Sequence, residues 1–113
     1  MSIAADLIRG HTDTIILAQL LQSDSYGYRI NKTVKELTDG RYEFKEATLY
    51  SAFKRLEEEH FIKSYWGSEE SGARRRYYAI TDEGRCAYER LVTEWDQLKN
   101  TVETLIRVSS NKL

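Results

Sequence analysis

The spacing of apolar residues along the chain predicts helices over four stretches. Residues 5–22 are nearly all apolar after Thr14 and repeat apolar side chains at close to helical spacing, so we expect one helix at the centre of the core. Residues 23–25 offer turn and capping oxygens. A second helix follows and ends near Asp39 and Gly40, with an apolar stripe made of Tyr26, Ile30, Val34 and Leu37.

A third helix is expected over residues 45–60, because its apolar residues fall within a narrow arc when each residue turns by about 100°. The apolar face consists of Leu49, Ala52, Phe53 and Leu56. The opposite, polar face presents Ala47, Ser51 and Lys54, with Thr48 and Arg55 along one edge and Tyr50 along the other. Small residues in the first turns allow another surface to approach the backbone closely. This polar face is therefore a candidate binding surface.

The next segment predicts a β-hairpin with a long tip. Residues 61–66 and 74–80 are rich in β-branched and aromatic side chains, and they flank the polar residues 67–73. Trp66 ends the first strand, where we expect it to pack at the base of the hairpin. A two-stranded ribbon needs support from other elements, here the helices.

A last helix is expected over residues 82–107, with Thr81 as its N-cap. Its apolar residues follow the 3-4-3-4-3 spacing of a coiled-coil seam, through Tyr88, Leu91, Trp95, Leu98, Val102 and Leu105. Such a helix measures about 39 Å, whereas a compact domain of this size has a radius of gyration of only about 13 Å. The seam therefore extends beyond the domain, and we expect it to pack against a second copy of the chain. The expected dimer residues are Leu91, Trp95, Leu98, Val102 and Leu105.

Composition narrows the function classes. The 113 residues include 41% hydrophobic and 31% charged positions and no proline, which suits one soluble, helix-rich domain. The formal net charge is -1, from 17 basic and 18 acidic residues, so contact with nucleic acid requires a local basic cluster. No apolar stretch approaches the roughly 18 residues that span a bilayer, and we expect no membrane partner.

Catalysis and metal binding find no support in the residues. Cys86, His11 and His60 lack the spacing of metal ligands, and no local signature places a base beside the thiol. We therefore expect no enzyme activity, no metal and no cofactor. The role of Cys86 stays open, and a single cysteine without a secretory cue favours the cytoplasm.

The order helix, helix, helix, hairpin, long helix is typical of a winged helix-turn-helix, in which the third helix enters the major groove of DNA and the hairpin, or wing, reaches the flanking backbone. Arginines open the second strand beside the tip, where guanidinium groups can pair with phosphates. A run of three arginines is by itself more often a solvated surface. Together with the element order, it predicts a DNA surface made of Ala47, Thr48, Tyr50, Ser51, Lys54, Arg74, Arg75 and Arg76.

Four short motifs resemble the PadR family of bacterial transcriptional regulators. They are YGYRI at residues 26–30, EATLY at 46–50, FKRLE at 53–57 and GARRRYY at 72–78, the last leading into Ile80, Thr81 and Gly84. The likeness extends over about residues 7–105, and the single C-terminal helix is similar to that of the compact PadR subgroup. The resemblance implies a dimeric winged-helix repressor whose third helix and wing read a palindromic operator in double-stranded DNA.

Within the family, the chain resembles a lactococcal multidrug-binding repressor, in which a tryptophan of the last helix and its symmetry mate sandwich planar aromatic drugs. Trp95 matches this tryptophan, while Asp6 and Leu7 match an acidic and an apolar residue that line the same pore. Lys99 stands where this repressor has a carboxylate, and we expect Asp96 to substitute for it in part. The resemblance thus implies a planar aromatic effector bound by Trp95, Asp6, Leu7 and Asp96.

Several alternatives stay open at this level. Trp95 also suits simple interface packing, and Tyr50 suits a scaffold role as well as a phosphate contact. Residues 26–28 suit packing of the second helix, with Gly27 permitting a close helix contact. A winged helix can also serve as a protein-interaction module without a small-molecule effector.

The sequence predicts a mainly α fold with a two-stranded β-wing. We expect residues 1–80 to form a winged helix-turn-helix domain and residues 81–113 a C-terminal dimerisation helix, the two making one compact unit. The predicted function is that of a homodimeric, DNA-binding transcriptional repressor.

Overall fold

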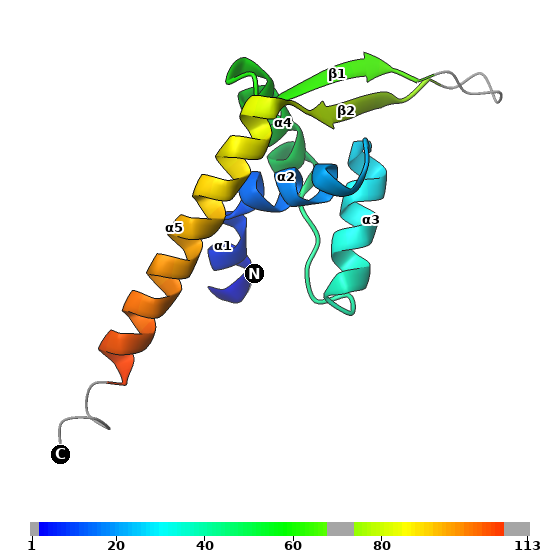
Figure 1. Cartoon of the computed structure of the whole chain (residues 1–113). Coiled ribbons are helices and arrows are strands. Elements are labelled where there is room, and N and C mark those ends of the chain that lie inside the picture. Colours follow the sequence, from blue (N-terminus) through cyan, green and yellow to red (C-terminus); the bar gives the residue numbers. More distant parts are fainter. Residues whose placement is uncertain (1–2, 68–73, 108–113) are drawn as a thin grey trace.

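The computed structural model describes residues 3–67 and 74–107. Over these residues the elements follow the order α1 (Ile3–Arg9), α2 (Thr12–Gln22), α3 (Gly27–Leu37), α4 (Glu46–Glu58), β1 (Ile62–Trp66), β2 (Arg76–Ile80) and α5 (Asp82–Ile106) (Figure 1). This mostly helical architecture with an antiparallel hairpin before a long last helix confirms the predicted fold class.

The N-terminal segment differs from the single helix predicted over residues 5–22. It forms two helices that meet at Gly10 and His11, and α2 turns away from α1 (Figure 1). Gly10 lowers helix propensity, because it loses more backbone freedom than other residues. The Thr12 hydroxyl then donates to the carbonyl oxygen of Arg9 at 2.6 Å, which stabilises the corner. The prediction of one continuous helix is wrong.

The core lies between α2, α3, α4 and the strands. Its largest fully buried side chains are Phe53, Ile16, Leu17, Leu20, Ile30 and Leu56. The ring of Phe53 stacks on that of Tyr78, with centroids 4.0 Å apart and planes 17° apart, so this pair joins α4 to β2. Burial raises the pKa of the Tyr78 hydroxyl above its ordinary value, and the nearby positive charge of Arg76 opposes this rise.

The wing is an antiparallel pair in which Ile62 is opposite Ile80 and Trp66 is opposite Arg76. Both strands are shorter than predicted, since Phe61, Arg74 and Arg75 lie outside them, and the predicted tip falls largely on residues 68–73, outside the described residues. The turn between α2 and α3 extends the sheet, because Ser25 exchanges two backbone hydrogen bonds with Tyr78, at 2.8 and 3.1 Å. Trp66 is 54% exposed at the end of β1.

The start of α5 is fixed against the wing. The Thr81 hydroxyl accepts from the backbone N–H of Gly84 at 3.0 Å and donates to the carbonyl oxygen of His60 at 2.7 Å, so the predicted N-cap is confirmed. At Gly84 a Cβ atom would overlap the carbonyl oxygen of Phe61, and only glycine allows this approach.

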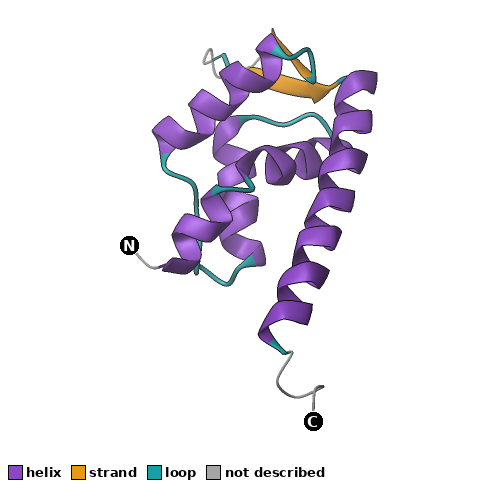
Figure 2. Ribbon diagram, turned by 90° about the vertical axis from the view of Figure 1, so that its left-hand side faces the viewer, coloured by secondary structure: helices purple, strands orange, loops and turns teal. Residues whose placement is uncertain are grey.

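The rest of α5 leaves the domain. The helix packs on α2 near its start, and its C-terminal half stands clear of the other elements except α1 (Figures 1 and 2). The molecule is accordingly elongated, with extents of 67 × 31 × 21 Å and a radius of gyration of 16.8 Å. The predicted overhang of the last helix is therefore present.

Candidate functional site

The polar face of α4 is displayed to solvent. Ala47, Tyr50, Ser51 and Lys54 are exposed, and Thr48 is half-buried. They are held in place from behind by the buried Leu49, Ala52, Phe53 and Leu56 on the other side of the same helix. The structure thus brings together the five α4 residues that the sequence predicts for a DNA surface.

Tyr50 connects this face to α3. Its hydroxyl oxygen lies only 2.8 Å from where a Cβ of Gly27 would be, and its ring meets Phe53 edge-on at 5.6 Å. A larger residue at position 27 would displace the tyrosine. Tyr50 thus packs between α3 and the core, and its ring is still 49% exposed toward solvent.

The two arginines just before β2 lie over aromatic rings. The guanidinium carbon of Arg74 is 4.8 Å from the centroid of Trp66, and that of Arg75 is 4.7 Å from the centroid of Tyr26. Such cation–π contacts orient the planar guanidinium groups. Arg74 and Arg75 line an open groove of about 680 Å³. The other residues that line it are Tyr26, Gly27, Tyr28, Tyr50, Trp66 and Arg76. This groove brings the predicted wing residues beside Tyr50 of the polar face of α4.

Arg76 has different surroundings from its two neighbours. Its Nη2 lies 3.6 Å from a carboxylate oxygen of Glu57 on α4, and its guanidinium carbon is 5.7 Å from the centroid of Trp66. The other oxygen of Glu57 accepts a hydrogen bond from the Ser64 hydroxyl at 2.7 Å. Sequence reasoning missed Glu57, which follows the apolar Leu56 and belongs to no periodic pattern.

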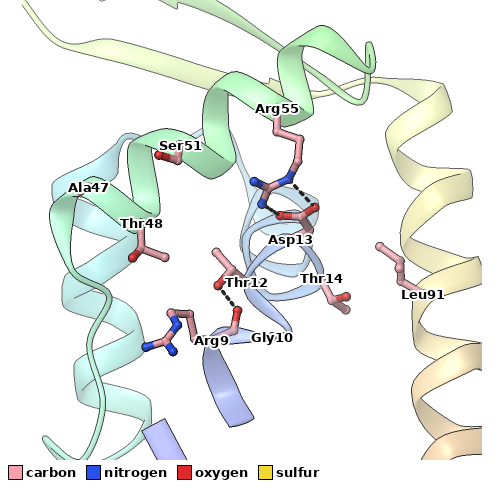
Figure 3. Close-up of a pocket in the computed structure, with 10 residues that line it drawn as sticks. All are labelled: Arg9, Gly10, Thr12, Asp13, Thr14, Ala47, Thr48, Ser51, Arg55 and Leu91. Atoms are coloured by element: carbon pink, nitrogen blue, oxygen red, sulfur yellow. Dashed lines mark hydrogen bonds and ion pairs between the residues drawn. The ribbon is translucent and has the colours of Figure 1, made fainter. Parts of the chain in front are cut away.

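A polar cleft of about 510 Å³ separates α4 from the corner between α1 and α2 (Figure 3). Arg55 crosses it to pair with Asp13, and its Nε donates to the Asp13 carboxylate at 3.2 Å. The hydrogen bond to Asp13 raises the pKa of Arg55 further above its ordinary value. Arg55 lies on the exposed side of α4, as expected, and also forms an ion pair with Asp13 of α2. Thr48 and Ser51 line the same cleft from α4.

An apolar patch lies on the side of the molecule formed by α1 and α5. We use this name for Leu7, Ile8, Trp95, Leu98 and Val102, which line an open groove of about 470 Å³ with His11, Lys99 and Glu103. The Trp95 ring meets the His11 ring edge-on, with centroids 5.0 Å apart. The patch joins Leu7 and Trp95, as the resemblance implies. His11 and Ile8 were missed, since their placement depends on the corner between α1 and α2.

Two of the four expected ligand residues stand away from this groove lining. Asp6 pairs with Arg9 at 2.8 Å, and Asp96 pairs with Lys99 at 3.7 Å, and neither carboxylate lines the groove. Both pairs are between residues three positions apart on one helix, a spacing that favours local pairing. Each carboxylate therefore has a cationic partner on its own helix.

The predicted dimer seam divides in two. Leu91 is half-buried and packs against the core of its own chain, together with Tyr88. Trp95, Leu98, Val102 and Leu105 are 42 to 67% exposed. The same apolar spacing thus runs from side chains that pack within their own chain to side chains that are exposed to solvent.

Neither a cluster of metal ligands nor a membrane-spanning helix is found in the part of the chain that the structure describes. No group of three or more His, Cys, Asp or Glu side chains among residues 3–67 and 74–107 could hold a metal ion. Within those ranges no helix combines the length and the apolar character needed to cross a membrane. Cys86 is a free, exposed cysteine on α5.

Comparison with known proteins agrees with this geometry. The model of the transcriptional regulator PadR-like family matches residues 16–90, from α2 into α5. This chain belongs to the PadR-like family. A transcriptional regulator from Clostridium thermocellum is similar to it, with 49% identity over 88% of this chain and 96% of the other, at a TM-score of 0.81.

Two further PadR structures support the assignment. A PadR family transcription regulator from Clostridium difficile R20291 is 41% identical over 85% of this chain and 98% of the other, with a TM-score of 0.73. One from Eggerthella lenta is 31% identical over 92% of this chain and 88% of the other, with a TM-score of 0.79. These relatives are named as transcriptional regulators, so DNA-binding regulation is the function that the PadR-like assignment supports.

Proposed function

We propose that this PadR-like chain is a homodimeric repressor that reads a palindromic operator. The observation that carries the proposal is the exposed polar face of α4 flanked by Arg74 and Arg75 of the wing. Ala47, Ser51 and Lys54 meet the major groove, because small and polar side chains on a supported helix can approach base edges closely. The wing arginines contact the backbone beside it.

The apolar patch supplies the dimer contact. Leaving Leu98 and Val102 of the patch, and Leu105 beyond it, in water is unfavourable, and a second copy covers the same face by two-fold symmetry. The α4 helices of the two copies then contact two half-sites that lie about one helical turn of DNA apart, or a multiple of one turn. A palindromic operator follows from this symmetry.

A planar aromatic effector is proposed for the groove at Trp95. The groove is mostly apolar, and a second indole across the two-fold axis would give a flat slot in which aromatic rings stack. Leu7 and Trp95 form its walls, whereas Asp6 and Asp96 act through their charge outside the lining. A ligand changes DNA affinity only if it prefers one arrangement of the dimer, so induction requires that the angle between the two wing domains differs with and without DNA.

The first experiment is titration of the protein onto duplex DNA from the region upstream of its own gene, over a range of salt concentrations. Binding to phosphates releases counterions, so the affinity should fall steeply as salt rises. The double variant Arg74→Ala/Arg75→Ala should lower the slope of log affinity against log salt by about 2 per protomer, since each phosphate that is no longer neutralised lowers it by roughly 0.9.

The matched control is Arg85→Ala/Arg90→Ala, which removes the same charge from exposed positions on α5 and should leave the slope near its wild-type value. Equal slopes for the wing variant and the wild type would remove the wing from the mechanism. Salt-insensitive binding to another protein, with no binding to the duplex, would favour the protein-interaction module instead.

A further inference from the structure

One carboxylate joins the recognition helix to both strands of the wing. Glu57 lies in the last turns of α4, and its side chain is 29% exposed. One of its oxygens accepts from Ser64 of β1 at 2.7 Å, and the other lies 3.6 Å from the Arg76 guanidinium of β2. Ser64 and Arg76 stand two register steps apart, with Trp66 opposite Arg76. The contact therefore holds the end of the wing that leads to the tip.

On charge alone, a carboxylate at the position of Glu57 lowers the affinity for DNA. A negative charge near a surface that binds phosphates repels the ligand. Glu57 also draws Arg76 back toward α4, so the third arginine is engaged in an internal pair. Arg74 and Arg75 are oriented differently, since they stack on the rings of Trp66 and Tyr26.

We infer that Glu57 is a positioning residue for operator recognition. Glu57 sets the distance between the polar face of α4 and the arginines of the wing. Arg76 pairs with Glu57 and helps to hold this distance, while Arg74 and Arg75 contact phosphates. This inference rests on the proposed function, because it takes α4 and the wing as the two DNA-contacting elements. Two elements that bind one rigid ligand gain affinity when their spacing is already correct.

A positioning role and simple charge repulsion predict opposite changes in operator affinity when the charge of Glu57 is removed. If Glu57 only repelled phosphates, Glu57→Gln would bind DNA more tightly. A positioning role predicts that the same substitution weakens operator binding about tenfold, which corresponds to the loss of one charge-assisted hydrogen bond. Binding to unrelated duplex DNA should stay unchanged or tighten slightly, so the ratio of specific to nonspecific affinity falls.

The first test needs no DNA. Amide hydrogen exchange in the full-length protein should be about tenfold faster at the tip end of β1 and β2 of Glu57→Gln than in the wild type, since this end opens locally more often once its tie to α4 is weakened. Glu58→Gln, which removes the same charge from the exposed neighbouring position, is the control and should exchange like the wild type. Unchanged wing exchange in Glu57→Gln would overturn the inference.

The second test uses an operator selected by the wild-type protein from random duplexes. Glu57→Gln should lose discrimination, and Arg76→Gln should lose a similar amount, with the double variant no worse than either single one because the two groups act as a pair. The salt slope should stay unchanged in Arg76→Gln and fall by roughly 0.9 per protomer in Arg75→Gln, where one phosphate is no longer neutralised. Tighter operator binding by Glu57→Gln, or a lowered salt slope in Arg76→Gln, would refute the inference.

Failure of the proposed function has a different signature. A wild type that selects no duplex would contradict the DNA-binding proposal, while the exchange comparison would still decide whether Glu57 holds the wing.

Discussion

The two halves of α5 obey the same spacing but face different surroundings. In the first half, Gly84 lies against the backbone of Phe61, Ala87 is fully buried, and Leu91 packs against the core. In the second half, Leu98 is 50% exposed, and Val102 and Leu105 are exposed as well. The helix thus begins as part of its own domain and ends as an open apolar surface.

This difference shows that an apolar 3-4 spacing identifies which face of a helix is buried, but does not identify which surface covers that face. The 3-4 spacing places Leu91 and Leu98 on one stripe, two turns apart. Only the position of α2 and the wing decides that the stripe is covered up to Leu91. Substitutions in the two halves should therefore affect different equilibria, folding in the first and association in the second.

The strongest change at the open half is Leu98→Glu/Val102→Glu. It places like charges on both sides of the two-fold axis in a contact that excludes water, so the dimer dissociation constant should rise at least about 1,000-fold, about 4 kcal/mol. Sedimentation equilibrium at micromolar concentration measures this shift. The variant should keep its far-ultraviolet circular dichroism, because these residues contribute little to the core of one chain.

The control for that variant is Glu89→Gln/Glu94→Gln, at exposed positions outside the seam, which should sediment like the wild type. A wild type that sediments as a monomer at micromolar concentration would contradict the proposed dimer outright.

At the buried half, Gly84→Ala should lower the free energy of unfolding by about 3 kcal/mol, because the new methyl group overlaps the Phe61 carbonyl and forces α5 away from β1. Urea denaturation at fixed protein concentration measures the loss. Gly10→Ala is the comparison: its Cβ would meet only the Leu7 carbonyl, at an ordinary 3.4 Å. A loss in Gly84→Ala no larger than in Gly10→Ala would show that the start of α5 is not tightly held.

A pair of leucine truncations compares the halves directly. Leu91→Ala should destabilise the fold by about 2 kcal/mol with little change in the dimer dissociation constant, since its side chain packs within one chain. Leu98→Ala should do the reverse, and the midpoint of its thermal unfolding should depend less steeply on protein concentration than that of Leu91→Ala, because a larger dissociation constant leaves fewer chains in the dimer. Identical concentration dependence in the two variants would remove the distinction between the halves.

The sequence predicts the winged-helix order, the Thr81 cap and the two faces of α4, because each leaves a local or periodic signal. The corner at Gly10 could have been predicted, since a glycine followed two positions later by a threonine and then by an acidic residue is a typical helix boundary. The ion pairs of Arg55 with Asp13 and of Arg76 with Glu57 could not, because pairs between polar residues far apart in the chain follow no period. Those pairs decide which arginines face outward.

The smallest expected effect concerns Trp95, where the open half of α5 meets α1. If the groove holds planar aromatic molecules, Trp95→Ala should raise the dissociation constant of a planar dye about tenfold, about 1.4 kcal/mol, because each aromatic pair contributes about 0.5 to 1.5 kcal/mol beyond the buried area. Calorimetry gives the affinity, and quenching of Trp95 in a Trp66→Phe background locates the dye. Leu91→Ala, in the buried half, is the matched control and should bind the dye like the wild type. Unchanged dye affinity in Trp95→Ala would make the tryptophan an interface packing residue, and the two halves of α5 would then differ only in which chain they pack against.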